Sequence, residues 1–266
     1  MKDLQNKVAV ITGGAGGVGS ALAAQLADQG CHLALVDISG EALAKATSDL
    51  NDKNIRITSH TVDITDRAQM AALPADVLAE HGKVNILVNN AGITYQKSFE
   101  THSIEDWEKI VGINWWGLLY GCHYFLDALK ESGEGHIVNL SSMSAFVGLP
   151  GQTSYCATKA AVKLLSEAMW AEMEQLNIGV TSVHPGAIKT DMIQATLDSS
   201  DDLKAAQRNY ELAQKIGVTP EHVATRIIKA IRKKQLRIRV GKDAILLDLL
   251  KRWFPVGIQK LLRIAV

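Results

Sequence analysis

The chain has 266 residues, 47% of them hydrophobic and 21% charged, and its formal net charge is zero. This composition is that of an ordinary globular protein, long enough to bury a large core in one α/β domain. No stretch resembles a secretory signal or a membrane span, and Cys31, Cys122 and Cys156 have neither metal nor disulfide spacing. We therefore expect a reduced, cytoplasmic protein with no bound metal and no nucleic-acid partner.

Short apolar runs alternate with segments of helical spacing along most of the chain. The predicted strands cover residues 8–11, 32–38, 54–65, 85–92, 135–145, 179–186 and 236–241. The predicted helices cover residues 20–30, 41–52, 66–82, 103–132, 154–177 and 219–234. Pro74 is the expected place of a break in the third helix, and Thr219 with Pro220 form a typical helix start.

This alternation over about 240 residues is typical of a doubly wound parallel sheet. We predict an α/β fold with a single Rossmann-type domain, a seven-stranded parallel sheet and helices on both faces. The catalytic domain is expected to span residues 1–243, with a lid at about 191–217. Ligands of such sheets bind outside the carboxyl ends of the strands, so we expect the functional residues at those ends.

Residues 244–266 are predicted to form a basic amphipathic helical extension. From Arg226 to Val266 the chain has twelve Lys or Arg and two Asp or Glu, a local balance of +10. Pro255 and Gly257 should divide the extension into two short helices. Packing on its own domain or on a dimer mate is the commoner use of such a segment, and peripheral membrane contact is the alternative. Its apolar stripe comprises Leu246, Leu247, Leu249, Leu250, Trp253 and Phe254.

The first strand ends in a glycine-rich loop in which two patterns overlap. Gly14, Gly16 and Gly19 fit G-x-G-x-x-G, the general dinucleotide fingerprint. Thr12, Gly13, Gly17 and Gly19 fit a second spacing, T-G-x-x-x-G-x-G. Glycines let the backbone approach a pyrophosphate, and the following helix offers its positive N-terminus, although glycines alone also make simple turns.

The second strand ends at Asp37, eighteen residues beyond Gly19. A carboxylate there accepts hydrogen bonds from the adenosine ribose hydroxyls and repels a 2′-phosphate. No Lys or Arg lies in the glycine loop or just after Asp37, so the pattern favours NAD over NADP. The alternative is that Asp37 merely caps the helix that starts near Gly40.

Two further strand ends and the helix after the second of them carry polar groups. Asn89 to Gly92 form a turn suited to a flat ligand, and Ser141 with Ser142 end the fifth strand. Tyr155 and Lys159 are four residues apart on one helix and share a face. The neighbouring ammonium should favour the phenolate and lower the Tyr155 pKa from about 10 toward neutrality, where proton transfer is most effective.

Taken together, these motifs resemble the short-chain dehydrogenase/reductase family over nearly the whole chain. The resemblance selects the glycine frame that contains Thr12, and it implies an NAD(H)-dependent enzyme that interconverts a secondary alcohol and a ketone. The alternative is an NAD-binding sensor or scaffold that acts through the basic C-terminal extension. The matching residues are T-G-x-x-x-G-x-G at Thr12 to Gly19, Asp63, Asn89-Asn90-Ala91-Gly92, Asn114, Ser142, Y-x-x-x-K at Tyr155 to Lys159, and Pro185-Gly186 followed by Thr190.

The resemblance implies four catalytic residues. Tyr155 would be the general acid in reduction and the base in oxidation, and Ser142 would hold the substrate oxygen by a hydrogen bond. Lys159 would lower the Tyr155 pKa and bind the nicotinamide ribose. Asn114 would hold a water that links Lys159 to solvent.

The resemblance also implies a set of cofactor-binding residues spread over the strand ends. Asp63 with Ile64 would lie at the adenine, and Ile188 with Thr190 would hold the carboxamide. Taken singly, Asn114 could cap a kink, Thr190 could cap a helix and Pro185-Gly186 could be only a turn. The full set is Thr12, Gly13, Gly17, Val18, Gly19, Asp37, Ile38, Asp63, Ile64, Asn90, Ala91, Gly92, Tyr155, Lys159, Pro185, Gly186, Ile188 and Thr190.

The substrate end is less determined by the sequence. Beside Ser142, the expected walls are Met143, Phe146, Gln152 and Tyr95, which favour an uncharged alcohol or ketone. We expect His184 to be a hydrogen-bonded core histidine rather than a catalyst. Family members usually pair through the helices at 103–132 and 154–177, so we expect a homodimer or homotetramer, with Trp115 and Trp116 in the interface or the core.

Overall fold

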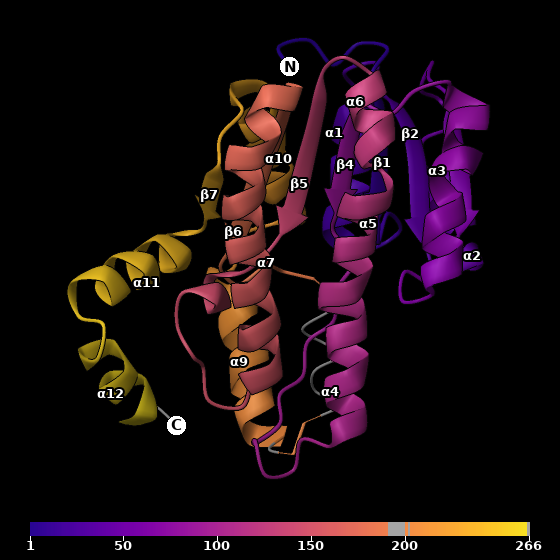
Figure 1. The fold of residues 1–266 in the computed structure, drawn as a ribbon. Coiled ribbons are helices and arrows are strands. Elements are labelled where there is room, and N and C mark those ends of the chain that lie inside the picture. The colour runs from indigo at the N-terminus through magenta and orange to yellow at the C-terminus, as the bar shows by residue number, and fades with distance from the viewer. Residues whose placement is uncertain (191–199, 202, 265–266) are drawn as a thin grey trace.

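Seven parallel strands form one sheet in the order β3-β2-β1-β4-β5-β6-β7 (Figure 1). The computed structural model describes residues 1–190, 200–201 and 203–264. The strand order reverses between β1 and β4, and the crevice at such a reversal is where doubly wound sheets bind ligands. The strands are β1 Val8–Thr12, β2 His32–Asp37, β3 Ile57–Thr61, β4 Ile86–Asn89, β5 Gly135–Leu140, β6 Ile178–Pro185 and β7 Arg237–Val240.

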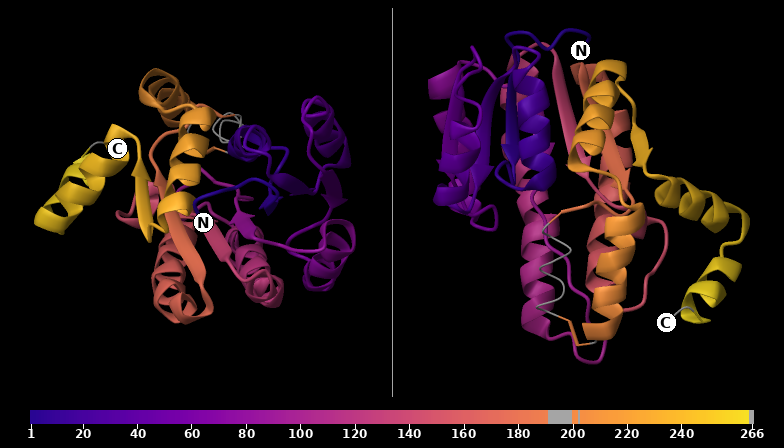
Figure 2. Two further views of the ribbon diagram at one scale, coloured as in Figure 1. Left: turned by 90° about the horizontal axis from the view of Figure 1, so that it is seen from above. Right: turned by 180° about the vertical axis from the view of Figure 1, so that it is seen from behind.

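Helices cover both faces of the sheet (Figure 2), which confirms the predicted fold class. Buried side chains of α1, α2 and α10 form one core cluster, and those of α3, α5 and α7 form a second. The helices are α1 Gly17–Ala27, α2 Gly40–Ser48, α3 Arg67–His81, α4 Ile104–Val111, η1 Gly112–Gly117, α5 Leu118–Tyr124, α6 Leu126–Glu131, η2 Met143–Ala145, α7 Thr153–Met173, η3 Glu174–Leu176, α9 Leu203–Ile216, α10 Pro220–Lys233, α11 Lys242–Trp253 and α12 Gly257–Ile264.

Burial along the strands explains their composition. Every residue of β1, β4, β5 and β6 is buried, because helices cover both faces of these central strands. Such strands lack the alternation of apolar and polar residues, and the polar residues that β4, β5 and β6 contain are buried as well. The edge strand β3 is half-exposed and accordingly carries Thr58, Ser59 and His60.

Two sequence expectations about helices are wrong. The single helix predicted for residues 103–132 is divided into α4, the π-helical turn η1, α5 and α6. A π turn adds one residue to a single helical turn, and an apolar pattern taken over the whole segment does not locate such a local change. Pro74 lies inside α3 and does not break it, because buried Met70, Leu73 and Val77 hold the helix on the sheet.

Two short helices, α11 and α12, form the C-terminal extension. Helix α11 begins at Lys242, two residues before the expected boundary at residue 244, so Asp243 belongs to the extension. Both helices project from the body of the domain (Figures 1 and 2). Trp253, Phe254 and Val256 are exposed at the turn between them. Of the predicted lid, residues 191–199 and 202 lie outside the described residues, and α9 forms most of the rest. Within the described residues, no helix is both long and apolar enough to cross a membrane.

Candidate active site

Thr12 and Asn90 join the two loops at the strand reversal. The Thr12 hydroxyl accepts hydrogen bonds from the backbone N–H groups of Asn90, at 3.1 Å, and Ala91, at 3.2 Å. In return, the Asn90 amide donates to the carbonyl oxygens of Thr12 and Gly13, both at 3.0 Å. These side chains fix the loop after β1 against the loop after β4, at the site where the sequence predicts a dinucleotide.

The glycine loop is crowded where the selected frame requires it. Gly13 has a positive φ of 63°, and a Cβ at Gly19 would collide with the Gly13 carbonyl oxygen. A Cβ at Gly17 would lie 2.9 Å from the Thr190 methyl group. Gly16 belongs only to the other frame, and a Cβ there would make ordinary contact at 3.5 Å, although Gly14 is crowded too.

Helix α1 begins directly after this loop without a side-chain cap. Its N-cap is Gly16, which offers no side-chain acceptor for the first N–H groups of the helix. Uncapped N–H groups and the positive end of the helix dipole form a typical binding site for phosphate oxygens. The loop therefore fits the pyrophosphate of a dinucleotide.

Asp37 lies at the end of β2 beside the glycine loop. Its carboxylate accepts hydrogen bonds from the N–H groups of Ala15, at 3.3 Å, and Ser39, at 3.2 Å. The cap of α2 is Ser39, whose hydroxyl accepts from the N–H of Ala42 at 3.2 Å. The alternative that Asp37 is merely the cap of α2 is therefore wrong, and the carboxylate fits a ribose hydroxyl at this strand end.

Ser142, Tyr155 and Lys159 lie together at the end of β5. The Ser142 side chain lies close enough to the Tyr155 phenol to lower its pKa, and the Lys159 Nζ atom is 5.7 Å from the centre of the Tyr155 ring. Lys159 is 5% exposed and donates a hydrogen bond to the carbonyl oxygen of Leu140 at 2.8 Å. The three side chains that the sequence selects for proton transfer are thus neighbours in space.

Burial controls the ionisation of this group. It raises the pKa of Tyr155 above its ordinary value, and the neighbouring Ser142 side chain opposes this effect only in part. Burial also lowers the pKa of Lys159 to about 8. The expected lowering of the Tyr155 pKa by Lys159 is absent from this structure, because removal of the phenol from water dominates its ionisation.

The His184 ring hydrogen-bonds to the backbone of Ser142. Burial lowers the His184 pKa to about 4, so the ring is neutral near pH 7. Its Nδ1 atom lies 3.0 Å from the carbonyl oxygen of Ser142, which can only accept, so the proton is on Nδ1. Nε2 then accepts from the Ser182 hydroxyl at 2.9 Å, which confirms a satisfied core histidine.

Sequence reasoning missed that His184 orients the backbone of Ser142. The pairing of β5 with β6 is what could have revealed this contact, because it places the end of β6, which contains His184, beside the end of β5. The Ser142 hydroxyl also accepts from the N–H of Ser144 at 3.1 Å.

Asn114 lies in η1, and its polar side-chain atoms are engaged. Its carbonyl oxygen accepts from the N–H of Ile93 at 2.8 Å, and its amide donates to the carbonyl oxygen of Ile93 at 2.9 Å. The amide also contacts the Thr158 hydroxyl at 3.3 Å. Asn114 thus fixes the loop after β4 against α7, and its role in a proton relay stays a prediction.

The loop after β6 reaches the glycine loop, which brings distant predicted residues together. Ile188 pairs with Val218 in an isolated bridge, and the Thr190 methyl group lies against Gly17. At the β4 end, a Cβ on Gly92 would lie 3.3 Å from the Lys159 ammonium. Residues predicted from four separate strand ends therefore border one region.

Four predicted cofactor residues have local roles in this structure. The Asp63 carboxylate accepts from the backbone N–H and the hydroxyl of Thr65, at 2.9 and 2.7 Å. Ile64 is buried and contacts the position of Gly117 in η1. Val18 packs in the core beneath α1, whereas Ile38 is 68% exposed at the end of β2.

Several side chains that are predicted to line the substrate pocket pack against other residues of the protein in this structure. The Phe146 ring packs at a tilt of 33° on His184 with 4.5 Å between ring centres, and Tyr95 packs edge-on against His102 at 5.2 Å. The Gln152 amide donates to the Gln96 carbonyl oxygen at 3.2 Å, and Met143 is half-buried beside Ser142. Contact of these walls with a substrate stays a prediction.

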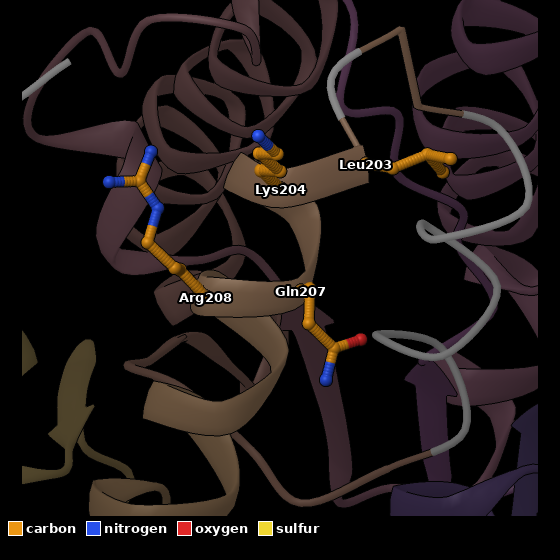
Figure 3. A pocket seen from close by; sticks show the side chains of 4 residues that line it. All are labelled: Leu203, Lys204, Gln207 and Arg208. Carbon is orange, nitrogen blue, oxygen red and sulfur yellow. The ribbon is translucent and has the colours of Figure 1, made fainter.

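A separate hollow of about 720 Å³ lies at the start of α9 (Figure 3). It is lined by Leu203, Lys204, Gln207 and Arg208, none of which is a predicted site residue. Figure 3 shows these four side chains pointing in different directions instead of converging on one point. The arrangement is unlike a site with convergent polar groups.

Comparisons with known proteins agree with this geometry. The sequence model described as short chain dehydrogenase matches residues 7–201. The putative oxidoreductase SadH of Mycobacterium tuberculosis (strain ATCC 25618 / H37Rv) is 34% identical over 269 residues, which cover 100% of this chain and 97% of that protein. The 3-oxoacyl-(acyl-carrier-protein) reductase FabG of Chlamydia muridarum is 34% identical over 222 residues, which cover 83% of this chain and 88% of that protein.

Among solved structures, a short-chain dehydrogenase/reductase from Burkholderia phymatum in complex with NAD superposes with a TM-score of 0.88. It is 27% identical in sequence, and the match covers 97% of each chain.

Proposed function

This chain belongs to the short-chain dehydrogenase/reductase family and is an oxidoreductase, and we propose that it interconverts a secondary alcohol and a ketone with NAD(H). The observation that carries this proposal is the meeting of Ser142, Tyr155 and Lys159 at the end of β5, beside the glycine loop of the strand reversal. When bound, the nicotinamide supplies or accepts the hydride, so the work of the protein is positioning and proton transfer.

Tyr155 is the proton donor in the proposed reduction. Because its pKa is raised, the phenol keeps its proton at neutral pH and can give it to a carbonyl oxygen. The Ser142 hydroxyl, which in this structure donates to the Ser144 hydroxyl at 3.2 Å, holds the same oxygen when a substrate is bound. In the oxidation direction Tyr155 must first lose its proton, so alkaline conditions favour that direction.

Lys159 lies where it can bind the nicotinamide ribose. With a pKa of about 8, the side chain is mostly protonated at pH 7, and it can donate to two hydroxyls while it keeps its bond to Leu140. The same charge favours the phenolate that Tyr155 becomes after it gives up its proton.

The position of Asp37 supports NAD over NADP. Its carboxylate lies beside the N–H of Ala15 in the glycine loop, where a 2′-phosphate would meet like charge. Asp37→Ser should raise kcat/KM for NADPH relative to NADH by about tenfold or more. Ser39→Ala, which removes the cap of α2 but keeps the carboxylate, is the control; an unchanged preference in Asp37→Ser contradicts the assignment.

The substrate in this proposal is an uncharged alcohol or ketone. None of the predicted walls, Tyr95, Met143, Phe146 and Gln152, carries a charge. A second polar group on the substrate, besides the reacting oxygen, would hydrogen-bond to the Gln152 amide, which in this structure is paired with Gln96.

A sensor or scaffold that acts through the basic extension is not favoured. A protein that only binds NAD has no need for Ser142, Tyr155 and Lys159 as neighbours. The discriminating experiment is NADH consumption, with NADPH in parallel, across aliphatic, aromatic, diketone and steroid carbonyls. We expect turnover with NADH on at least one class; NADH binding with no turnover on any carbonyl would support the sensor.

A further inference from the structure

Asp243, in the first turn of α11, bonds to the loop that follows β6. One carboxylate oxygen accepts a hydrogen bond from the backbone N–H of Ala187 at 2.7 Å. The other accepts from the N–H of Ala244 in its own helix at 2.9 Å. The carboxylate thus joins the C-terminal extension to the segment that leads to the predicted carboxamide-binding residues.

Asp243 also explains why position 186 is glycine. Gly186 is not among the glycines with positive φ, so its backbone conformation does not exclude other residues. A Cβ at this position would instead collide with both oxygens of the Asp243 carboxylate. The Pro185-Gly186 motif therefore provides the space that the carboxylate fills.

The segment after Gly186 is held on several sides. The N–H of Gly186 donates to the carbonyl oxygen of Val240 at 2.8 Å, and the carbonyl oxygen of Ala187 accepts from the N–H of Val218 at 2.9 Å. The remaining Ala187 group, its N–H, is the one bound by Asp243. Three residues later, Thr190 lies against Gly17 of the glycine loop.

Helix α11 is a firm support for this contact. Asp248, one turn further along, is 3% exposed and accepts hydrogen bonds from Arg239 of β7 at 2.7 Å and from Arg252 at 3.1 Å. A buried carboxylate paired with two guanidinium groups ties α11 to the edge of the sheet. Asp243 is therefore fixed relative to β6 and β7, where α11 leaves the domain (Figure 1).

We propose that Asp243 is a positioning residue for the nicotinamide end of the cofactor: its carboxylate holds Ala187 so that Ile188 and Thr190 face the carboxamide. This inference rests on the proposed function, because it takes NAD(H) as the ligand. It gives the C-terminal extension a role in positioning the nicotinamide end of the cofactor. This role is separate from those of the glycine loop and of the Tyr155 group.

The test compares two ligands that differ only at the nicotinamide. Asp243→Asn keeps the shape of the side chain, but its single carbonyl oxygen cannot accept from both Ala187 and Ala244. We expect the Kd for NADH to rise about tenfold, while the Kd for ADP-ribose, which lacks the nicotinamide, stays within about twofold. NADH fluorescence and calorimetry give these two constants.

Lys242→Ala is the matched control, since Lys242 is exposed on the same turn of α11. It should leave both constants unchanged. Equal weakening of NADH and ADP-ribose in Asp243→Asn would mean a general structural defect and would overturn the proposal, as would no change in either constant. A wild-type protein that shows no preference for NADH over ADP-ribose would overturn it as well.

A second pair of variants changes Gly186, the residue that faces the Asp243 carboxylate. Gly186→Ala should weaken NADH binding because its methyl group displaces the carboxylate, and the same change should do less harm in an Asp243→Ala background. Additive effects would contradict the contact. These binding ratios do not depend on turnover, so wild-type protein that binds NADH but reduces no carbonyl would refute the proposed function and leave the role of Asp243 measurable.

Discussion

Lys159 bears the clearest electrostatic cost of any single residue in the candidate site. It is buried, the acceptor it has is the Leu140 carbonyl oxygen, and its pKa is lowered to about 8. A charged group held in such surroundings favours the unfolded chain, where water solvates it. This destabilisation is consistent with a site arranged to hold a charge for chemistry.

The stability of the protein should report this cost as a pH dependence. Between about pH 8 and the ordinary lysine pKa of 10.5, the unfolded chain binds more protons at Lys159 than the folded chain does. The contribution of Lys159 to the free energy of unfolding therefore rises with pH through this window, by about 3 kcal/mol in total.

The measurement is denaturant unfolding of the wild type and Lys159→Met at several pH values from 7 to 10. Because methionine does not titrate, the difference between the two proteins isolates Lys159 from the cysteines and tyrosines. Lys159→Met should be the more stable protein at pH 7, and its advantage should shrink toward pH 10. Parallel curves would contradict the buried, titrating lysine.

At the residue scale, the sequence predicts which residues form the site better than it predicts their pKa values. The spacing of Tyr155 and Lys159 places them on one helix face, and Asp37 follows directly from the end of its strand. The direction of the Tyr155 pKa depends on how deeply the ring is buried, which no local spacing encodes. The bond from Asp243 to Ala187 joins residues 56 apart and has no local signature either.

At the scale of secondary-structure elements, a buried polar network joins two central strands to two helices. The Asn89 amide of β4 donates to the Asn139 carbonyl oxygen of β5 at 2.9 Å and to the Cys122 sulfur of α5 at 3.2 Å. The Asn139 amide donates to the Ser166 hydroxyl of α7 at 3.0 Å. The Asn89 carbonyl oxygen has no partner among the described residues, so these three bonds are what join β4 and β5 to α5 and α7 in the network.

Removing Asn139 from this network should be costly. Asn139→Ala leaves the Asn89 amide without its main acceptor and Ser166 without its donor, in addition to a small cavity. We expect the free energy of unfolding to fall by about 3 kcal/mol. Exposed Asn54→Ala should cost less than about 0.5 kcal/mol; chemical denaturation compares the two, and equal effects would contradict the role of the network.

The sequence predicts which segments form strands and helices, but not where a helix is divided by an irregular turn. Apolar runs bounded by glycines predict the buried strands because both sheet faces are covered. The π turn at Gly112–Gly117 was not predictable from local spacing, and its Asn114 binds Ile93, which lies 21 residues away along the chain. Pro74 shows the converse: packing of its neighbours overrides a local breaker.

At the scale of the whole molecule, large apolar side chains remain exposed on the helices expected to form an interface. Trp116 is 45% exposed, and on α7 Leu164 is 62% and Trp170 38% exposed. The α4–α5 segment and α7 lie side by side on one face of the domain (Figure 1). Exposed apolar side chains gathered on one face are typical of a subunit interface.

We predict that the protein is a homodimer or homotetramer that associates through this face. Leu164→Arg places a charge in the middle of it and should shift the molar mass, measured by light scattering after size exclusion, to a smaller species. Leu261→Arg, on the exposed side of α12, is the control for assembly through the C-terminal extension. Dissociation by Leu261→Arg alone would contradict the prediction and move the interface to the extension.

The parallel sheet and the place of the site follow from strand–helix alternation, because parallel strands place their carboxyl ends at one edge. The projection of α11 and α12 from the body does not follow from their sequence: amphipathic spacing predicts helices but not where they pack. The ties through Asp243 and Asp248 are what place α11, and both depend on partners outside the extension.

The measurement that tests the central claim most directly is the rate of NADH oxidation by the best carbonyl, in the wild type and in Tyr155→Phe, with the Kd for NADH determined for both proteins. If Tyr155 is the proton donor, the substitution lowers kcat about 1,000-fold and leaves the Kd for NADH within about twofold. A variant that keeps turnover near that of the wild type would show that the proton comes from elsewhere, and the proposed mechanism would be wrong.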